Sequence, residues 1–182
     1  MEKKLATMAL SLLAASFIAA SVFAYYPLTL TVQPTTPPVV FETGSNANQN
    51  DLGPSNTIVV SIGSNSTSAT VTIHPTYQRT YYRDVLRIKN NDVKAYYVWL
   101  SLESVSNSLP PGSRVSLLVG SQNITLTSLS TGAKVQVGPI SGSSTLTIDI
   151  EVYIPEGSSI SGASATFNLN AIYTPSSSEE PP

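Results

Sequence analysis

The sequence lacks cysteine, has a single histidine and is sparse in charge. Without cysteine it can form no disulfide, so an exported fold must be held together by packing, strand pairing or assembly. Charged residues make up 11% of the chain, whereas a typical soluble domain has about 25%. Because the formal net charge is −2, nothing in the composition attracts a phosphate backbone, and we expect no nucleic-acid partner.

Side chains suited to catalysis are also scarce. The histidine, His74, continues the outward face of a predicted strand, which favours an exposed imidazole over a catalytic or metal-bound one. The closest candidates for a catalytic pair of carboxylates are Asp84 with Asp92 and Asp149 with Glu151. Strand alternation places the second pair on a solvated face. We therefore expect no enzymatic activity, no cofactor and no metal site.

The first 24 residues have the features of an export signal. Charged residues at 2–4 precede an Ala- and Leu-rich apolar stretch at 5–23, and cleavage after Ala24 would make Tyr25 the new N-terminus. An uncleaved anchor is one alternative, and another is a type IV pilin leader, cut before Thr7, that retains the apolar helix in the fibre. We expect a removed signal peptide and a secreted protein that meets the membrane only during export.

Strand patterns of period two fill the rest of the chain. Residues 145–154 alternate apolar and polar side chains throughout, which indicates one buried and one solvated face. The runs at 58–62 and 69–73, joined by a turn at 63–66, predict a hairpin. A second, aromatic hairpin is predicted from Leu86 to Leu102 around Asn90-Asn91-Asp92. Further strands are predicted at 114–119, 123–127, 134–137 and 165–173.

This succession of strands predicts an all-β fold. No window after Ala24 has a convincing helical stripe, and turn signals recur at the spacing of about 8–12 residues that is typical of sandwiches. We predict a single antiparallel β-sandwich at 39–174, either jelly-roll or Ig-like, because hairpins leave the strand order open. The tail at 175–182 has no apolar side chain to bury and is expected to be disordered.

The segment 25–33 (YYPLTLTVQ) is predicted to form an isolated strand that precedes the sandwich. Its apolar Leu28, Leu30 and Val32 alternate with polar side chains, and the proline-rich spacer 34–38 follows, extending about 3.1 Å per residue where it is polyproline-like. Such a strand can pair within its own domain or complete the sheet of a neighbouring subunit. Head-to-tail repetition of a contact between identical chains that does not close yields a filament.

Two N-glycosylation sequons lie at or beside predicted turns. They are Asn65-Ser66-Thr67 and Asn123-Ile124-Thr125, so Asn65 and Asn123 are candidate glycosylation sites on an exported protein.

Tyrosines gather in two stretches, at Tyr77, Tyr81 and Tyr82 and at Tyr96 and Tyr97. Aromatic faces stack on sugars, so a secreted carbohydrate-binding or adhesin module is an alternative function. The same pattern is typical of cross-strand pairs and of the margin of a core.

The order of export signal, N-terminal strand and single β-domain resembles the TasA and camelysin family of biofilm-fibre proteins, and more narrowly the archaeal bundling pilins. The segment from Arg83 to Leu102, which contains RDVLRIKNNDVKAYYVWL, carries this resemblance. The resemblance implies a jelly-roll that polymerises by donor-strand complementation into filaments that bundle laterally. Its donor residues would be Tyr25, Tyr26, Leu28, Leu30 and Val32. Some relatives carry a metalloprotease label, but this chain has no His-Glu-x-x-His motif.

The sequence thus leads to one expected function. We expect a secreted structural subunit of extracellular filaments, with identical subunits and neighbouring filaments as its partners, in a biofilm matrix or at the cell surface.

Overall fold

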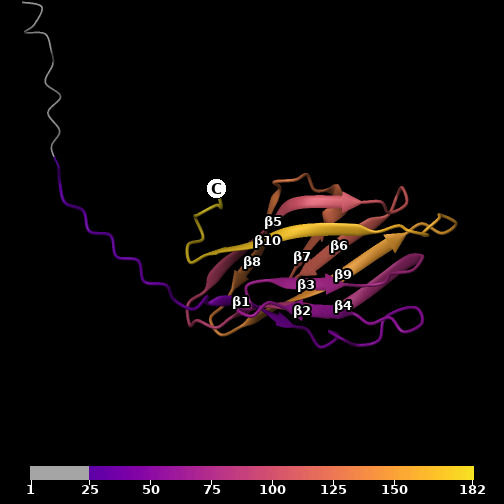
Figure 1. Ribbon diagram of the computed structural model, residues 1–182, viewed down its shortest axis with the longest axis horizontal. Helices are drawn as coiled ribbons and strands as arrows, with labels where there is room; N and C mark the ends of the chain where they lie inside the picture. Colours follow the sequence, from indigo (N-terminus) through magenta and orange to yellow (C-terminus); the bar gives the residue numbers. More distant parts are fainter. Residues whose placement is uncertain (1–24) are drawn as a thin grey trace, which may run out of the picture. The chain divides into compact units, whose positions relative to one another are not determined.

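A computed structural model describes residues 25–182, and these are nearly all β-structure with antiparallel sheets (Figure 1). The predicted signal peptide, with Ala24, and the alternative pilin leader lie outside the described residues. Residues 25–35 belong to one compact unit and residues 36–182 form another. In the described part of the chain, no helix has the length and apolarity needed to cross a membrane.

Ten strands run from Val39 to Thr174. They are β1 (Val39–Thr43), β2 (Val59–Ile62), β3 (Ala69–Thr72), β4 (Gln78–Asn90), β5 (Tyr96–Asn107), β6 (Arg114–Val119), β7 (Gln122–Thr125), β8 (Lys134–Ile140), β9 (Thr145–Ile154) and β10 (Ala165–Thr174), with one short 3-10 turn, η1 (Leu126–Ser128). The strands predicted at 114–119 and 145–154 are confirmed at the same residues, and the other strands predicted from residue 58 onward are confirmed with shifted ends. The segment 25–33, predicted as an isolated strand, has no strand in the structure, and its pairing stays a prediction.

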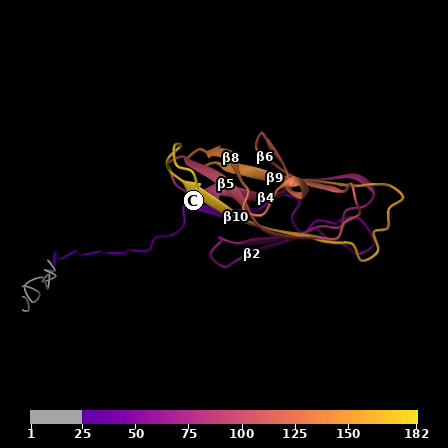
Figure 2. The ribbon, with the colours of Figure 1, turned by 90° about the horizontal axis from the view of Figure 1, so that it is seen from above.

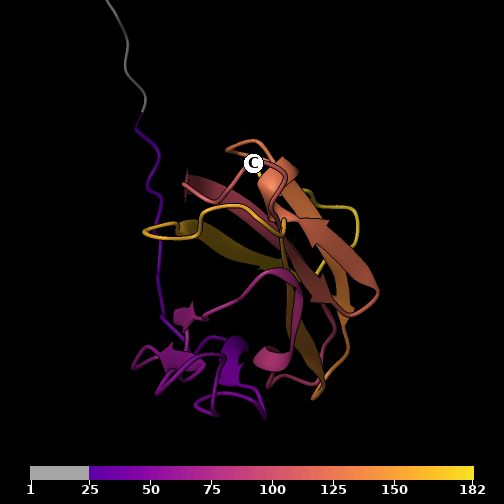
Figure 3. The ribbon, with the colours of Figure 1, turned by 90° about the vertical axis from the view of Figure 1, so that its right-hand side faces the viewer.

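The strands form a two-layered sandwich, which confirms the predicted fold class. One layer is a five-stranded sheet in the order β1-β4-β9-β6-β7, and the other contains a three-stranded sheet in the order β10-β5-β8 (Figures 1 and 3). A separate two-stranded sheet, β2-β3, completes the domain. All of the pairings between these strands are antiparallel.

The core lies between the layers and follows the alternation of the sequence. On β9 the inward residues Ile148, Ile150, Val152 and Ile154 are 2% to 8% exposed, while the residues between them are only half-buried. The facing row on β5 is Tyr96, Val98, Leu100 and Leu102, all at 9% exposure or less. Burying these rows supplies most of the free energy that folds a chain without disulfides.

The hairpin predicted at 58–73 is confirmed. Strands β2 and β3 pair from Val59 with Thr72 to Ile62 with Ala69. As the alternation predicts, Val60 is buried whereas its neighbour Val59 is 41% exposed. The hairpin turn also reaches the five-stranded sheet, because the backbone N–H of Phe41 on β1 donates to the Ser66 carbonyl at 2.7 Å.

The second predicted hairpin, from Leu86 to Leu102, is wrong. Strands β4 and β5 do not pair, since β4 belongs to the five-stranded sheet and β5 to the three-stranded sheet. The segment Asn90-Asn91-Asp92 is therefore a corner at which the chain crosses between layers. The side chain of Asn90 is fully buried there, and its Nδ2 donates to the carbonyl oxygens of Lys94 at 2.7 Å, Ile140 at 3.3 Å and Ser141 at 3.0 Å.

The reason for this difference is physical. Asn and Asp residues favour a chain reversal through local hydrogen bonds, such as the one that the Asp92 backbone N–H donates to Asn90 Oδ1 at 2.9 Å. Those bonds reverse the chain whether the next strand pairs with β4 or crosses to the other sheet. The sheet that β5 joins therefore depends on distant partners. Here β5 pairs with β8 and β10.

Candidate functional site

The segment 25–33 is the most exposed apolar stretch of the described chain. Five large side chains in it, Tyr25, Tyr26, Leu28, Leu30 and Val32, are 76% to 90% exposed. Residues 25–37 carry no strand, and the first strand of the domain is β1. An exposed apolar stretch of this kind is a candidate interaction site, since water disfavours apolar surface.

The two candidate glycosylation sites are accessible. Asn65 lies in the turn between β2 and β3, and Asn123 lies on β7, and both side chains are exposed. Their occupancy stays a prediction.

The tyrosines predicted as a possible sugar-binding platform do not form one surface. Tyr82 and Tyr96 are buried at 5% and 9% exposure, whereas Tyr81 is 50% exposed. The ring of Tyr96 packs edge-on against Tyr173, with ring centroids 5.6 Å apart, so it belongs to the margin of the core.

His74 does not stand alone at the surface. Its side chain is 40% exposed, and Nδ1 lies 3.1 Å from Oδ2 of Asp51, whose side chain is only 1% exposed. The backbone N–H groups of His74, at 2.6 Å, and Leu52, at 2.7 Å, also donate to this carboxylate. The arrangement fastens the loop after β1 to the end of the β2-β3 hairpin.

The titration of Asp51 reflects this environment. Burial by itself would raise its pKa, but the hydrogen bonds from Leu52 and His74 outweigh burial, and the pKa of Asp51 lies below its usual value. Burial and the negative charge of Asp51 raise the pKa of Tyr82 above its usual range. A depressed carboxyl pKa stabilises the fold above the unfolded-state value, and that stability is lost as the pH falls through the folded-state pKa.

Replacing Asp51 by alanine should therefore lower the free energy of unfolding by about 1–2 kcal/mol at pH 7, because the backbone N–H groups of Leu52 and His74 and the His74 ring lose their shared acceptor. Glu180→Ala in the exposed tail is the matched control and should change little. Chemical denaturation measures both variants. Equal stability of wild type and Asp51→Ala would contradict the proposed anchoring role.

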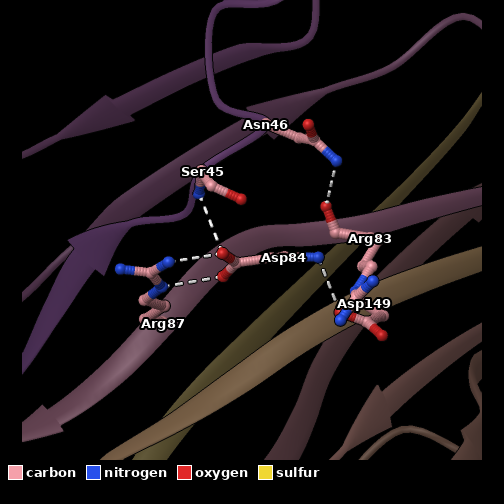
Figure 4. Close-up of polar contacts among 6 residues, drawn as sticks. All are labelled: Ser45, Asn46, Arg83, Asp84, Arg87 and Asp149. Atoms are coloured by element: carbon pink, nitrogen blue, oxygen red, sulfur yellow. Dashed lines mark hydrogen bonds and ion pairs between the residues drawn. The ribbon is translucent and has the colours of Figure 1, made fainter.

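A second polar cluster surrounds Asp84 (Figure 4). The register between β4 and β9 shifts between Tyr82 and Leu86, and Asp84 in this irregularity has φ +46°. Its backbone N–H donates to Oδ1 of Asp149 at 2.6 Å, which replaces the lost ladder bond. The bulged conformation is thus satisfied by a side chain of the neighbouring strand.

The carboxylate of Asp84 holds the loop after β1. It accepts hydrogen bonds from the Ser45 backbone N–H at 3.0 Å and from Arg87 Nε at 2.7 Å. The Arg87 guanidinium holds the pKa of Asp84 well below its usual range. Gly44 is required beside it, because a Cβ there would lie 1.9 Å from the Asp84 carbonyl oxygen.

These carboxylates are engaged in holding the backbone. The pocket around them is lined by Ser45, Asn46, Arg83, Asp84, Thr147 and Asp149. Asn46 Nδ2 donates to the Arg83 carbonyl at 2.7 Å, so the amide too has a structural partner (Figure 4). Within residues 25–182, no three His, Asp or Glu side chains gather as metal ligands would.

A scan against models of protein families and a search of curated proteins find no match to this chain.

Proposed function

We propose that the mature protein is a structural subunit that polymerises into extracellular filaments by giving residues 25–33 to a neighbouring subunit as a β-strand. The observation that carries this proposal is the 76% to 90% exposure of five large apolar side chains in one segment that has no charged side chain. The resemblance to TasA-like biofilm fibres and archaeal bundling pilins supports the same function. On this proposal the partners are identical subunits, and bundling brings neighbouring filaments together.

The physical basis is strand addition. A donated strand gains backbone hydrogen bonds from the recipient sheet, and pockets for its alternate side chains provide specificity. The burial of each of the three side chains Leu28, Leu30 and Val32 would contribute about 1.5–3 kcal/mol to the free energy of association, because apolar surface leaves water. Because each chain has one donor segment and one recipient domain, repetition of this contact builds a filament.

Substitution of Leu30 tests this role. Leu30→Asp should lower the amount of sedimenting filament at least about 10-fold, because an unpaired carboxylate would be buried in the recipient. The matched control is Thr31→Asp, whose side chain lies on the opposite face of the extended strand and stays in water. Ultracentrifugation and electron microscopy of the mature protein measure assembly. Equal assembly by the two variants would argue against donation of this face.

A further inference from the structure

The free edges of the sheets are not equivalent. The strand orders leave β1 and β7 at the edges of the large sheet and β8 and β10 at the edges of the three-stranded sheet. Strand β7 lies against β8, which brings the two layers together on that side. Strand β1 lies against β2, and the Phe41 N–H bonds to the hairpin turn. The remaining edges are those of β3 and β10, and Figures 1 and 2 draw β10 beside its partner β5.

Strand β10 also lacks the features that protect an edge. Natural proteins keep edge strands short or place charges and proline on them, since unpaired N–H and C=O groups attract other strands. Strand β7 has 4 residues, and β8 contains Pro139. Strand β10 has 10 residues (ATFNLNAIYT), none of them charged or proline. Within residues 25–182, its only backbone ladder is the one with β5. The extra residue at the register shift between them, Glu103, belongs to β5, so β10 itself has no bulge that would protect its edge.

The core is incomplete beside the same two strands. The inward residues Phe167, Leu169 and Ala171 of β10 contact the core but are only half-buried, and Tyr173 at the end of this row is 37% exposed. On β3, Ala69 and Val71 are half-buried as well. The inward residues of β9, by contrast, reach 8% exposure at most from Ile148 onward. Within residues 25–182, the apolar rows of β3 and β10 are thus left half-buried at the margin of the core.

The donor segment, residues 25–33, matches the edge strand β10 in length, in period and in its lack of charged side chains. Leu28, Leu30 and Val32 recur at every second residue, as do Phe167, Leu169 and Ala171 on β10. Neither segment has a charged side chain, so pairing them would bury no unpaired side-chain charge. A single added strand would pair with the free edge of β10 and place three aliphatic side chains beside the half-buried row, on the same face.

We infer that residues 25–33 of a second copy of this chain insert between β3 and β10, along the free edge of β10, and complete the sandwich there. The inference rests on the proposed function and assigns the recipient surface that polymerisation requires. Strands β1, β7 and β8 are then not recipients.

An inward charge on β10 tests this assignment. Ala171→Lys should leave the fold intact, because position 171 is half-buried at an edge, but it should raise the protein concentration needed for assembly at least about 10-fold, since strand insertion would bury an unpaired ammonium. Asn170→Lys on the outward face of β10 is the matched control and should assemble as wild type does. Circular dichroism verifies folding, and sedimentation measures assembly.

A mixing experiment separates donor from recipient. A chain lacking residues 25–33 keeps its recipient edge, and Ala171→Lys keeps its donor segment. Each should remain monomeric alone, and their mixture should form 1:1 dimers that grow no further, as measured by light scattering after size-exclusion chromatography. Continued growth of Ala171→Lys into filaments would place the recipient surface elsewhere while leaving the proposed function intact.

Disulfide trapping provides a measurement that does not depend on the stability of Ala171→Lys, and the absence of native cysteine removes background. Copies with Thr31→Cys would be mixed with copies carrying Thr166→Cys, Asn168→Cys or Asn170→Cys. At least one β10 position should form a linked dimer, because cross-strand Cα atoms about 4.4–6.8 Å apart can be bridged. Stronger linkage to Asn123→Cys on β7 or Lys134→Cys on β8 would overturn the inference. Absence of wild-type filaments would overturn the proposed function itself and this inference with it.

Discussion

Removal of residues 25–33 from the mature chain should abolish filament formation and leave a soluble, folded domain. The deleted residues supply no strand to any of the three sheets, and the buried core residues of the described chain lie from Val39 onward. Their loss should therefore change the free energy of unfolding by no more than about 0.5 kcal/mol, as for surface changes that remove no packing. Assembly would lose its donor entirely, so this variant has the largest expected effect on function.

The deletion is measured beside a control at the other terminus. Chains lacking residues 25–33 or residues 177–182 would be compared with the chain that begins at Tyr25, using sedimentation, electron microscopy and thermal unfolding by circular dichroism. The C-terminal truncation should still polymerise, because residues 177–182 contribute no strand. Filaments formed by the N-terminal deletion would contradict the proposed function.

Asn90→Asp should cause the largest loss of stability, about 3–5 kcal/mol at pH 7, because it buries an unpaired charge. Asn90 is 0% exposed, and its Nδ2 donates to three carbonyl oxygens where the chain crosses between the layers. A carboxylate has no proton to donate there and would face the carbonyl dipoles directly. The variant keeps the size of the side chain, so the loss would come from charge and hydrogen bonding.

The dependence of this effect on pH has a definite sign. Burial among carbonyl oxygens would raise the folded-state pKa of the introduced carboxyl above its unfolded-state value. The variant would then be least destabilised below the unfolded-state pKa, and the destabilisation would grow as the pH rises through the folded-state pKa. Asn91→Asp, at the exposed neighbouring position, is the matched control. Urea denaturation of both variants across this pH range tests the prediction, which fails if both unfold at the same urea concentration.

Much of the fold could be predicted because its information is local. The alternation along 145–154 predicted β9 at its observed bounds and the buried positions from Ile148 to Ile154. The turn at 63–66 predicted the β2-β3 hairpin, because a short connection leaves its two strands little choice but to pair. The period of segment 25–33 predicts a strand, but the segment has no strand partner in the structure and no strand is assigned to it.

The parts that could not be predicted depend on contacts between distant residues. Asp51 shows no signal in its neighbourhood that it binds His74, 23 residues away. The role of Asp84 likewise depends on Asp149, across a register shift that neither strand reveals alone. The long uncharged run at 165–174 was visible in the sequence, but only the strand order shows that it lies at an edge.

The sequence by itself determined that the chain is all-β, where most of its strands lie and which side chains point inward, because side-chain alternation is a property of each strand alone. Only the tertiary structure decided that β4 and β5 separate into two layers and that β10 is left with an open edge beside a half-buried row. Every strand edge offers the same backbone donors and acceptors, so backbone hydrogen bonding alone does not fix which strands pair. The strand order is decided by the packing of residues far apart in the chain, which a local sequence pattern does not predict.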